Sequence, residues 1–243
     1  MSWWFVSFRL IKEKRLSSFL SILLLAFGVS LISLMLSVEK QIDDTFRNNL
    51  KGIDLVVGAK GSPLQIILSS VYHIDAPTGN ISAKDAKAVA KSPFVSSAIP
   101  LSYGDSYKGF KILGTTSSYL DLYSSQFRKG SIFENSFDVV LGSNSSESLG
   151  LKIGDRFYGN HGLASESIEE HSDHAYVVVG VLEKSNSVLD NLILTSLNSV
   201  WNTHEHKHNN ESESKLITNI TEIDDAKSIT SMLIKYRGKM GAV

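Results

Sequence analysis

The sequence predicts an α+β protein, with one long apolar helix at the N-terminus and then a mixed domain of strands and short helices. The run from Phe19 to Val38 carries no charge and is long enough, as a helix, to cross a bilayer core about 30 Å thick. Beyond residue 53, short runs rich in Val, Ile, Tyr and Phe alternate with short helical patterns, which is typical of an α+β domain. Roughly 200 residues can bury a sizeable core, as one domain or as two subdomains.

The apolar run has three interpretations: a buried core helix, a cleaved signal peptide or a retained membrane helix. Its length argues against the core helix of a soluble protein. A signal peptide has an apolar region of about 7 to 15 residues before a small-residue cleavage site. This run instead continues directly into the charged sequence from Glu39 to Gln41. We therefore expect a transmembrane helix over residues 16–38 that stays in the membrane.

Charged residues flank the run asymmetrically. Four basic residues and one acidic residue precede it, whereas Glu39, Asp43 and Asp44 lie among the charges that follow. The positive-inside rule then places the N-terminus in the cytoplasm and the remaining chain outside the membrane. Residues 1–15 are expected to form an amphipathic helix at the cytoplasmic interface, where aromatic rings settle at headgroup depth: Trp3, Trp4, Phe5 and Phe8.

A stalk helix is predicted over residues 39–52, because Ile42, Phe46 and Leu50 recur there at helical spacing. The extracytoplasmic domain is expected over residues 53–222. It begins with a strand that ends at Gly58, and Gly61, Ser62 and Pro63 mark the following turn. Ser82 is placed to cap a helix over residues 83–91, with Asp85 at the capping-box position.

Further elements follow from local composition. Strands are expected where β-branched and aromatic residues gather, at residues 95–101, 109–113, 138–141, 156–158 and 176–182. Short helices are expected at residues 119–127, 145–150 and 197–201. A last amphipathic helix is predicted from Asp224 to Tyr236, and residues 223–243 would return toward the membrane. Two polar segments, residues 160–173 and 202–215, are expected to be exposed loops.

Charge and cysteine content exclude several classes of protein. Four of the 24 basic residues and one of the 25 acidic residues precede Glu39, which leaves 20 basic against 24 acidic residues outside. This mild acidity gives no reason to expect nucleic acid as a partner. The chain has no cysteine, so it has no disulfide, thiol chemistry or thiolate metal site.

Two sequence segments resemble the extracytoplasmic part of MacB-type, FtsX-like ABC-transporter permeases. The first runs from Asp138 to Gly159 and reads DVVLGSNSSESLGLKIGDRFYG. The second runs from Tyr176 to Trp201 and reads YVVVGVLEKSNSVLDNLILTSLNSVW. The order of interfacial helix, first span, stalk and large external domain also fits that family. Gly150 and Gly154 are suited to tight turns, and Asp155 to accepting hydrogen bonds from backbone N–H groups at a turn.

The resemblance implies a permease subunit in the bacterial inner membrane, with its main domain in the periplasm. No P-loop is present, because Gly58 to Ser62 lacks the required spacing, so a separate ATPase subunit is implied as a partner. The resemblance also implies a homodimer or heterodimer of permeases that exports or extracts a substrate. Such permeases carry three further spans after the external domain. We therefore expect this chain to be a truncated product or a fragment.

Six of the seven histidines fall in the two polar segments, and imidazole is a common zinc ligand. The candidate metal ligands are His161, His171, His174, His204, His206 and His208. His204, Glu205 and His208 even match H-E-x-x-H, but that motif needs a helix with apolar support and a third ligand. Weak chelation without a role is the alternative for these loops. His73 is expected to be a packed or turn residue.

No catalytic site is expected. The segment from Gly142 to Ser146 lacks the final glycine of a G-x-S-x-G nucleophile elbow. Paired carboxylates such as Asp224 and Asp225 are explained by solvated charge and helix capping. The function that competes with a permease segment is therefore a single-span anchored binding or sensing protein, with the histidine-rich loops holding a divalent metal such as zinc and no other cofactor.

Overall fold

The computed structural model describes residue 3 and residues 12–159, 175–204 and 216–238, except for the side chain of His204. The chain divides into two compact units, Met1–Arg47 and Asn48–Val243. The predicted interfacial helix over residues 1–15 lies mostly outside the described residues. Each unit is described below by itself.

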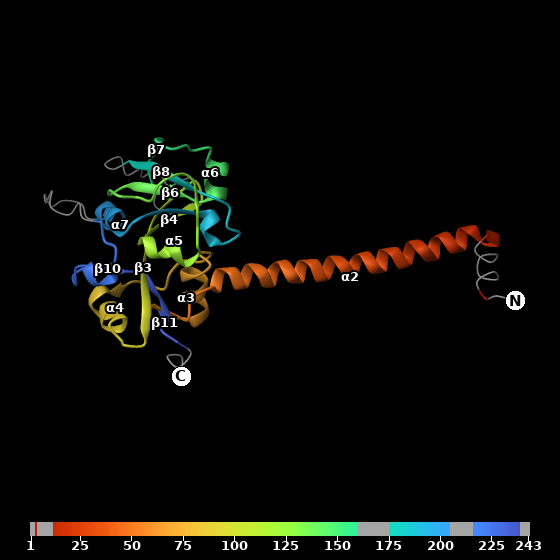
Figure 1. Cartoon of the computed structure of the whole chain (residues 1–243), viewed down its shortest axis with the longest axis horizontal. Coiled ribbons are helices and arrows are strands. Elements are labelled where there is room, and N and C mark those ends of the chain that lie inside the picture. The colour runs from red at the N-terminus through yellow and green to blue at the C-terminus, as the bar shows by residue number, and fades with distance from the viewer. Residues whose placement is uncertain (1–2, 4–11, 160–174, 205–215, 239–243) are drawn as a thin grey trace. The chain divides into compact units, whose positions relative to one another are not determined.

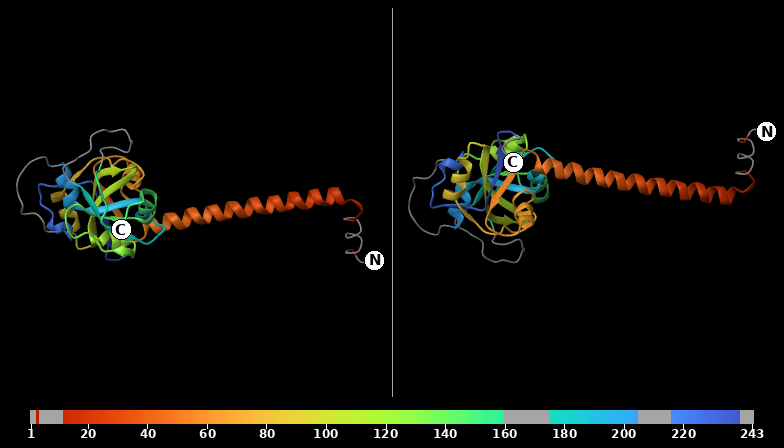
Figure 2. Two further views of the ribbon diagram at one scale, coloured as in Figure 1. Left: turned by 90° about the horizontal axis from the view of Figure 1, so that it is seen from above. Right: turned by 90° about the horizontal axis from the view of Figure 1, so that it is seen from below.

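The first unit contains most of helix α2 (Arg15–Leu50), which has 36 residues. Both views of Figure 2 draw α2 as one uninterrupted helix. It covers the range predicted for the membrane span and nearly all of the predicted stalk. By length and composition, α2 is the one helix among the described residues that is able to cross a membrane. Its last three residues, from Asn48 to Leu50, already belong to the second unit.

The second unit is built on one mixed sheet of nine strands, counted within the described residues. The strand order is β1-β11-β3-β4-β9-β6-β8-β5, and β7 pairs with β8. Figure 1 labels β11, β3, β4, β6, β8 and β7 among these strands. The pairs β4–β9 and β6–β8 are parallel and the other pairs are antiparallel. The strands are β1 (Leu55–Gly58), β3 (Val95–Tyr107), β4 (Phe110–Thr115), β5 (Phe127–Gly130), β6 (Asp138–Leu141), β7 (Arg156–Phe157), β8 (Tyr176–Leu182), β9 (Leu192–Ser196) and β11 (Ser231–Tyr236).

Strand β3 joins the two halves of the main sheet. Its first half pairs with β11, and its second half pairs with β4 after a register shift between Tyr103 and Ser106. The sheet therefore runs continuously from β1 at one edge to β5 at the other. Three clusters of buried apolar side chains pack along it. The first shares β3 and β11 with the second, and β4, β6, β8 and β9 with the third.

Short helices flank the sheet: α3 (Pro63–Ser70), α4 (Ala83–Ala90), α5 (Ser117–Leu122), α6 (Ser143–Leu149) and α7 (Leu197–His204), with 3-10 turns η1 (Val188–Asn191) and η2 (Ile220–Glu222). The predicted cap of α4 is confirmed, because the Ser82 side chain accepts a hydrogen bond from the Lys84 N–H at 3.1 Å. Helix α6 ends at Gly150, whose φ of 67° lies in the left-handed region. Asp155 accepts from the Lys152 N–H at 2.8 Å, as the sequence predicted.

The predicted C-terminal helix is wrong for the described residues. The segment instead forms β10 (Ser228–Ile229), which pairs with β2 (Ile81–Ser82), and β11. Strand β11 lies between β1 and β3, and its two faces are both buried: Met232 and Ile234 enter one core cluster, and Leu233 enters another. A strand that is buried on both faces has a continuous apolar run, which periodicity alone does not distinguish from a helix.

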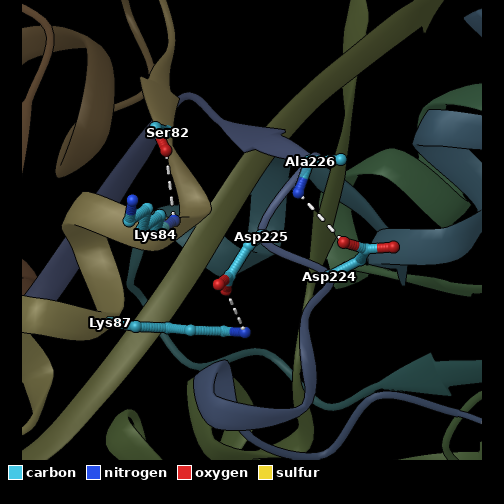
Figure 3. A network of polar contacts seen from close by, with 6 residues as sticks. All are labelled: Ser82, Lys84, Lys87, Asp224, Asp225 and Ala226. Carbon is cyan, nitrogen blue, oxygen red and sulfur yellow. Dashed lines mark hydrogen bonds and ion pairs between the residues drawn. The ribbon is translucent and has the colours of Figure 1, made fainter.

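The acidic pair before this segment caps no helix. As Figure 3 shows, an Asp224 carboxylate oxygen accepts from the Ala226 N–H at 3.0 Å and forms a tight turn. Asp225 forms an ion pair with Lys87 of α4 at 2.7 Å. These contacts hold the small β2–β10 sheet beside α4.

Other elements also differ from the predictions. The helix predicted over residues 119–127 ends at Leu122, and Phe127 already begins strand β5. Strand β9 was not predicted as a separate strand. Residues 202–204, predicted to open a polar loop, continue helix α7. The rest of both predicted loops, apart from this short piece, lies outside the described residues.

Candidate functional site

The last residues of α2 and the segment after them form a junction, where hydrogen bonds join them to the rest of the second unit. Helix α2 ends at Leu50, and Gly52, with a φ of 78°, turns the chain toward β1. The Asp54 N–H donates to the Ile234 carbonyl at 2.9 Å, and its carboxylate accepts from the Tyr236 N–H at 2.7 Å. Strand β1 then pairs with β11 in antiparallel register. The chain thus enters and leaves the domain through two adjacent strands.

Asn49 fixes the end of α2 in this junction. It is the buried residue of α2, with 5% of its surface exposed. Its side-chain Oδ1 accepts a hydrogen bond from the Val188 N–H at 3.0 Å, and its backbone carbonyl accepts one from the Tyr123 hydroxyl at 3.1 Å. One residue therefore joins the helix end to η1 and to the segment that follows α5.

The loop that presents the Val188 N–H is shaped by the buried carboxylate of Asp190. One of its oxygens accepts from both the N–H and the hydroxyl of Ser185 at 2.9 Å, and the other accepts from the Asn186 N–H at 2.8 Å. Several donors around one carboxylate fix a loop because each oxygen is satisfied in only one arrangement. The loop is therefore ordered by its own contacts.

A second polar cluster lies next to the junction and is centred on His73. This residue is buried, has a φ of 55°, and follows α3, so the expectation that it is a packed residue is confirmed. Its Nδ1 lies 2.5 Å from the Tyr103 hydroxyl and its Nε2 lies 2.7 Å from the Tyr119 hydroxyl. The Tyr103 hydroxyl also donates to the Ser69 carbonyl. The rings of Tyr119 and Tyr123 meet edge to face with centroids 5.4 Å apart.

Burial keeps this cluster neutral. Burial, with a smaller contribution from the nearby Lys111 ammonium, lowers the pKa of His73 to about 3. Burial likewise raises the pKa of Tyr123 to about 12 and raises the pKa values of Tyr103 and Tyr119. At neutral pH the histidine therefore has one donor nitrogen and one acceptor nitrogen, and the phenols keep their protons.

The predicted metal ligands fall almost entirely outside the described residues. This holds for His161, His171, His174, His206 and His208, while His204 is described only as a backbone position at the end of α7. No group of three or more ligand side chains that could hold a metal occurs in the described part of the chain. The metal site therefore remains a prediction from the sequence.

The ends of the two histidine-rich segments nevertheless lie together. Tyr176 follows the first segment and Thr203 precedes the second, and their hydroxyl groups are 3.3 Å apart. Gly159 precedes the first segment, and a Cβ built on it would lie 2.9 Å from the Cβ of buried Asp105. The fold therefore anchors both segments at one place on the domain.

Sequence reasoning did not identify the junction residues. Asn49 was a detectable signal, because it is an amide beside the apolar positions Phe46, Leu50 and Ile53 of the predicted stalk. The partners of His73 gave no local signal, since Tyr103 and Tyr119 are 30 and 46 residues away along the chain.

The two neighbouring amides at the end of α2 allow a matched test of the junction. Replacing Asn49 by Ala leaves the buried Val188 N–H without its acceptor, so we expect the free energy of unfolding to fall by about 1 to 3 kcal/mol. Asn48→Ala changes an exposed residue and should alter it by less than about 0.5 kcal/mol. Denaturant unfolding of the chain in detergent checks this difference. Equal losses in the two variants would show that Asn49 does not anchor the helix.

The buried histidine predicts a defined loss of stability in acid. Its pKa is lower in the folded chain than the ordinary 6.5, so the unfolded chain binds more protons between pH 6.5 and about 3. This contribution to stability is complete above pH 6.5 and falls by up to about 1.4 kcal/mol per pH unit as the pH drops toward 3.

The measurement compares the original chain with His73→Asn, which does not titrate, in denaturant series at several pH values. Carboxylates titrate in both proteins, so the difference between them isolates the histidine. Lys111, Tyr103 and Tyr119 are the titratable groups that contact or influence the ring, and each keeps its protonation state across this range. Identical pH dependence in both proteins would contradict the prediction.

Comparison with known proteins identifies the family. No curated protein sequence matches this chain. Among solved structures, the periplasmic region of MacB from Actinobacillus actinomycetemcomitans is 14% identical, with a TM-score of 0.47 over 79% of each chain. The extracellular domain of the ABC-type transporter YknZ from Gram-positive bacteria is 10% identical, with a TM-score of 0.45 over 76% of this chain and 86% of that one. A domain of a putative permease protein from Porphyromonas gingivalis is 19% identical, with a TM-score of 0.39 over 66% of this chain and 70% of that one.

A family model matches most of the chain. The model of the MacB-like periplasmic core domain covers residues 18–235, which include the end of α2, the junction and every strand of the main sheet. The two segments from which the resemblance was inferred, Asp138 to Gly159 and Tyr176 to Trp201, both lie inside this match. The chain therefore belongs to the MacB-like periplasmic core domain family.

Proposed function

We propose that this chain is the first span and external domain of an ABC-transporter permease, and that α2 carries motion from the membrane to that domain. The observation that supports this proposal is the continuity of α2. One helix of about 54 Å runs from the apolar segment to the buried side chain of Asn49. A regular helix resists bending, so a displacement of its membrane end moves the residue that binds η1.

A partner must supply the energy for such motion. The chain contains no phosphate-binding loop, so ATP would be hydrolysed by a separate cytoplasmic subunit. The basic residues before the apolar run support an N-terminus on that cytoplasmic side, with the span in the bacterial inner membrane. Paired permease subunits would then transmit ATP-driven closure of the ATPase to their external domains, which export or extract a substrate without catalysing a reaction on it.

The test uses the absence of native cysteine, since one introduced cysteine can be labelled without background. Lys184→Cys places the label on an exposed position of the loop that precedes η1. A membrane-impermeant maleimide should label it in intact cells. With a partner ABC ATPase co-expressed, a non-hydrolysable ATP analogue should change the fluorescence of an environment-sensitive label at this position.

A break in α2 provides the matched control. Two glycines inserted after the exposed Gln41 interrupt the helix, because glycine is a poor helix former and adds backbone freedom. The nucleotide response should then disappear although the ATPase still copurifies. Two alanines inserted at the same place add the same length while keeping the helix, and should preserve a response. A response that survives the glycine insertion, or a label that reacts only in opened cells, would refute the proposal.

We propose metal binding by the histidine-rich segments as a second function, that of an anchored sensor. The observation that favours it is the shared anchoring of the two segments beside Tyr176 and Thr203. Two tethered segments that start from one place reach each other at a high effective concentration. Neutral imidazoles from both would then supply nitrogen ligands for Zn²⁺.

Zinc titration of the chain in detergent tests this function. We expect saturable binding with a dissociation constant of micromolar or tighter, and its loss when His204, His206 and His208 are changed together to alanine. His73→Asn is the control, because that buried histidine should contribute nothing to binding. Failure to saturate, or an affinity unchanged by the triple substitution, would rule out the metal site and leave the permease proposal untouched.

A further inference from the structure

The hydrogen bonds around His73 have only one consistent direction. A carbonyl oxygen accepts but never donates, so the single hydroxyl proton of Tyr103 points at the Ser69 carbonyl. The Tyr103 oxygen must then accept its contact with His73, which places the imidazole proton on Nδ1. The ring is neutral, so Nε2 carries a lone pair and accepts from the Tyr119 hydroxyl. The tautomer of His73 is thereby determined by its partners.

This series of hydrogen bonds leads to the junction at the end of α2. Tyr119, at one end of it, packs its ring against the ring of Tyr123, and the Tyr123 hydroxyl donates to the Asn49 carbonyl at the end of α2. Ser69, at the other end, lies in the last turn of α3 and is buried. Every step is a direct contact between neighbouring side chains or between a side chain and a backbone carbonyl.

We infer that Asn49, Tyr123, Tyr119, His73, Tyr103 and Ser69 form a relay through which the end of α2 controls the stability of helix α3. The inference rests on the proposed function for its role in transport, and it names α3 as the element that responds. Polar contacts suit such a relay because each donor has one acceptor, so a displaced member leaves its neighbour unsatisfied. Apolar side chains in contact can shift against each other without leaving a hydrogen-bonding group unsatisfied.

Helix α3 is suited to respond because its N-terminal half is weakly held. It has eight residues, its N-cap Ser62 makes no side-chain capping bond, and Leu64 and Ile67 expose 65% and 39% of their surfaces. Short helices with exposed apolar side chains and weak caps open locally at low free energy. The bonds from Tyr103 to Ser69 and from His73 to Tyr103 restrain its C-terminal end.

The tautomer of His73 gives a direct test of the assigned hydrogen-bond directions. In nitrogen NMR of the chain with ¹⁵N-labelled histidine, the resonances absent from His73→Asn identify the ring of His73. We expect a protonated Nδ1 and an unprotonated Nε2 at pH 7. An Nε2-protonated ring or an imidazolium would overturn the assigned direction.

Hydrogen exchange tests the relay itself. Tyr123→Phe keeps the ring but removes the bond to Asn49, and Tyr103→Phe removes the bonds to His73 and Ser69. Both variants should accelerate exchange of the amides from Ile66 to Val71 at least fivefold. Tyr176→Phe is the control, because it removes a phenol hydroxyl from a different core cluster, and α3 should stay within twofold of the original rate.

The double variant and a reference strand complete the design. If the phenols act in one relay, the double variant Tyr123→Phe with Tyr103→Phe should accelerate amide exchange in α3 no more than Tyr103→Phe alone does. The amides of β6 should keep their original exchange rates, which separates local opening from global loss of stability. Unchanged α3 exchange in Tyr123→Phe, multiplicative effects in the double variant, or equal acceleration in β6 would each refute the relay. None of these measurements requires the ATPase, so their failure is distinct from failure of the proposed function.

Discussion

The pair of hydrogen bonds that Asn49 makes at the end of α2 is the constraint on which the proposed coupling depends. A helix attached by a flexible segment would transmit little, because the segment would absorb the displacement. Here the side-chain oxygen accepts from the Val188 N–H in a buried setting, and the backbone carbonyl accepts from the half-buried Tyr123 hydroxyl. Breaking the buried bond leaves a desolvated N–H group, which costs about 1 to 3 kcal/mol. The end of the helix therefore moves with the surface that it contacts.

The sheet extends this constraint across the domain. Strand β1 follows the junction, and β11 lies between β1 and β3, so the entering and leaving segments form one hydrogen-bonded unit with the longest strand. Strand β3 then continues into the second half of the sheet, and Tyr103 of the relay lies on it. A displacement at the junction reaches both the sheet and α3. Tyr103 belongs to both the sheet and the relay, because it lies on β3 and its hydroxyl donates to the Ser69 carbonyl of α3. Its substitution therefore tests the relay and not only the attachment of α2.

Much of the fold was predictable because its signals are local. Ser82 marks the start of α4 through its own side chain, and Gly150 ends α6 through its own backbone conformation. Strand β11 was mistaken for a helix because Met232, Leu233 and Ile234 are all buried, on both faces of the strand. The relay was unpredictable for a different reason. Its members become neighbours only after the sheet forms, and neither a phenol nor a lone histidine marks its partner in the sequence.

The neutrality of the relay indicates what kind of signal it transmits. The low pKa of His73 and the raised pKa of Tyr123 lie well outside the physiological range, so no member changes charge near neutral pH. A proton-driven switch would need a group that titrates close to the ambient pH. The relay instead depends on distance and direction, since hydrogen bonds weaken steeply as their geometry departs from the optimum. Its natural input is therefore a displacement of the α2 end, which is the input that a helix continuous with a membrane span would deliver.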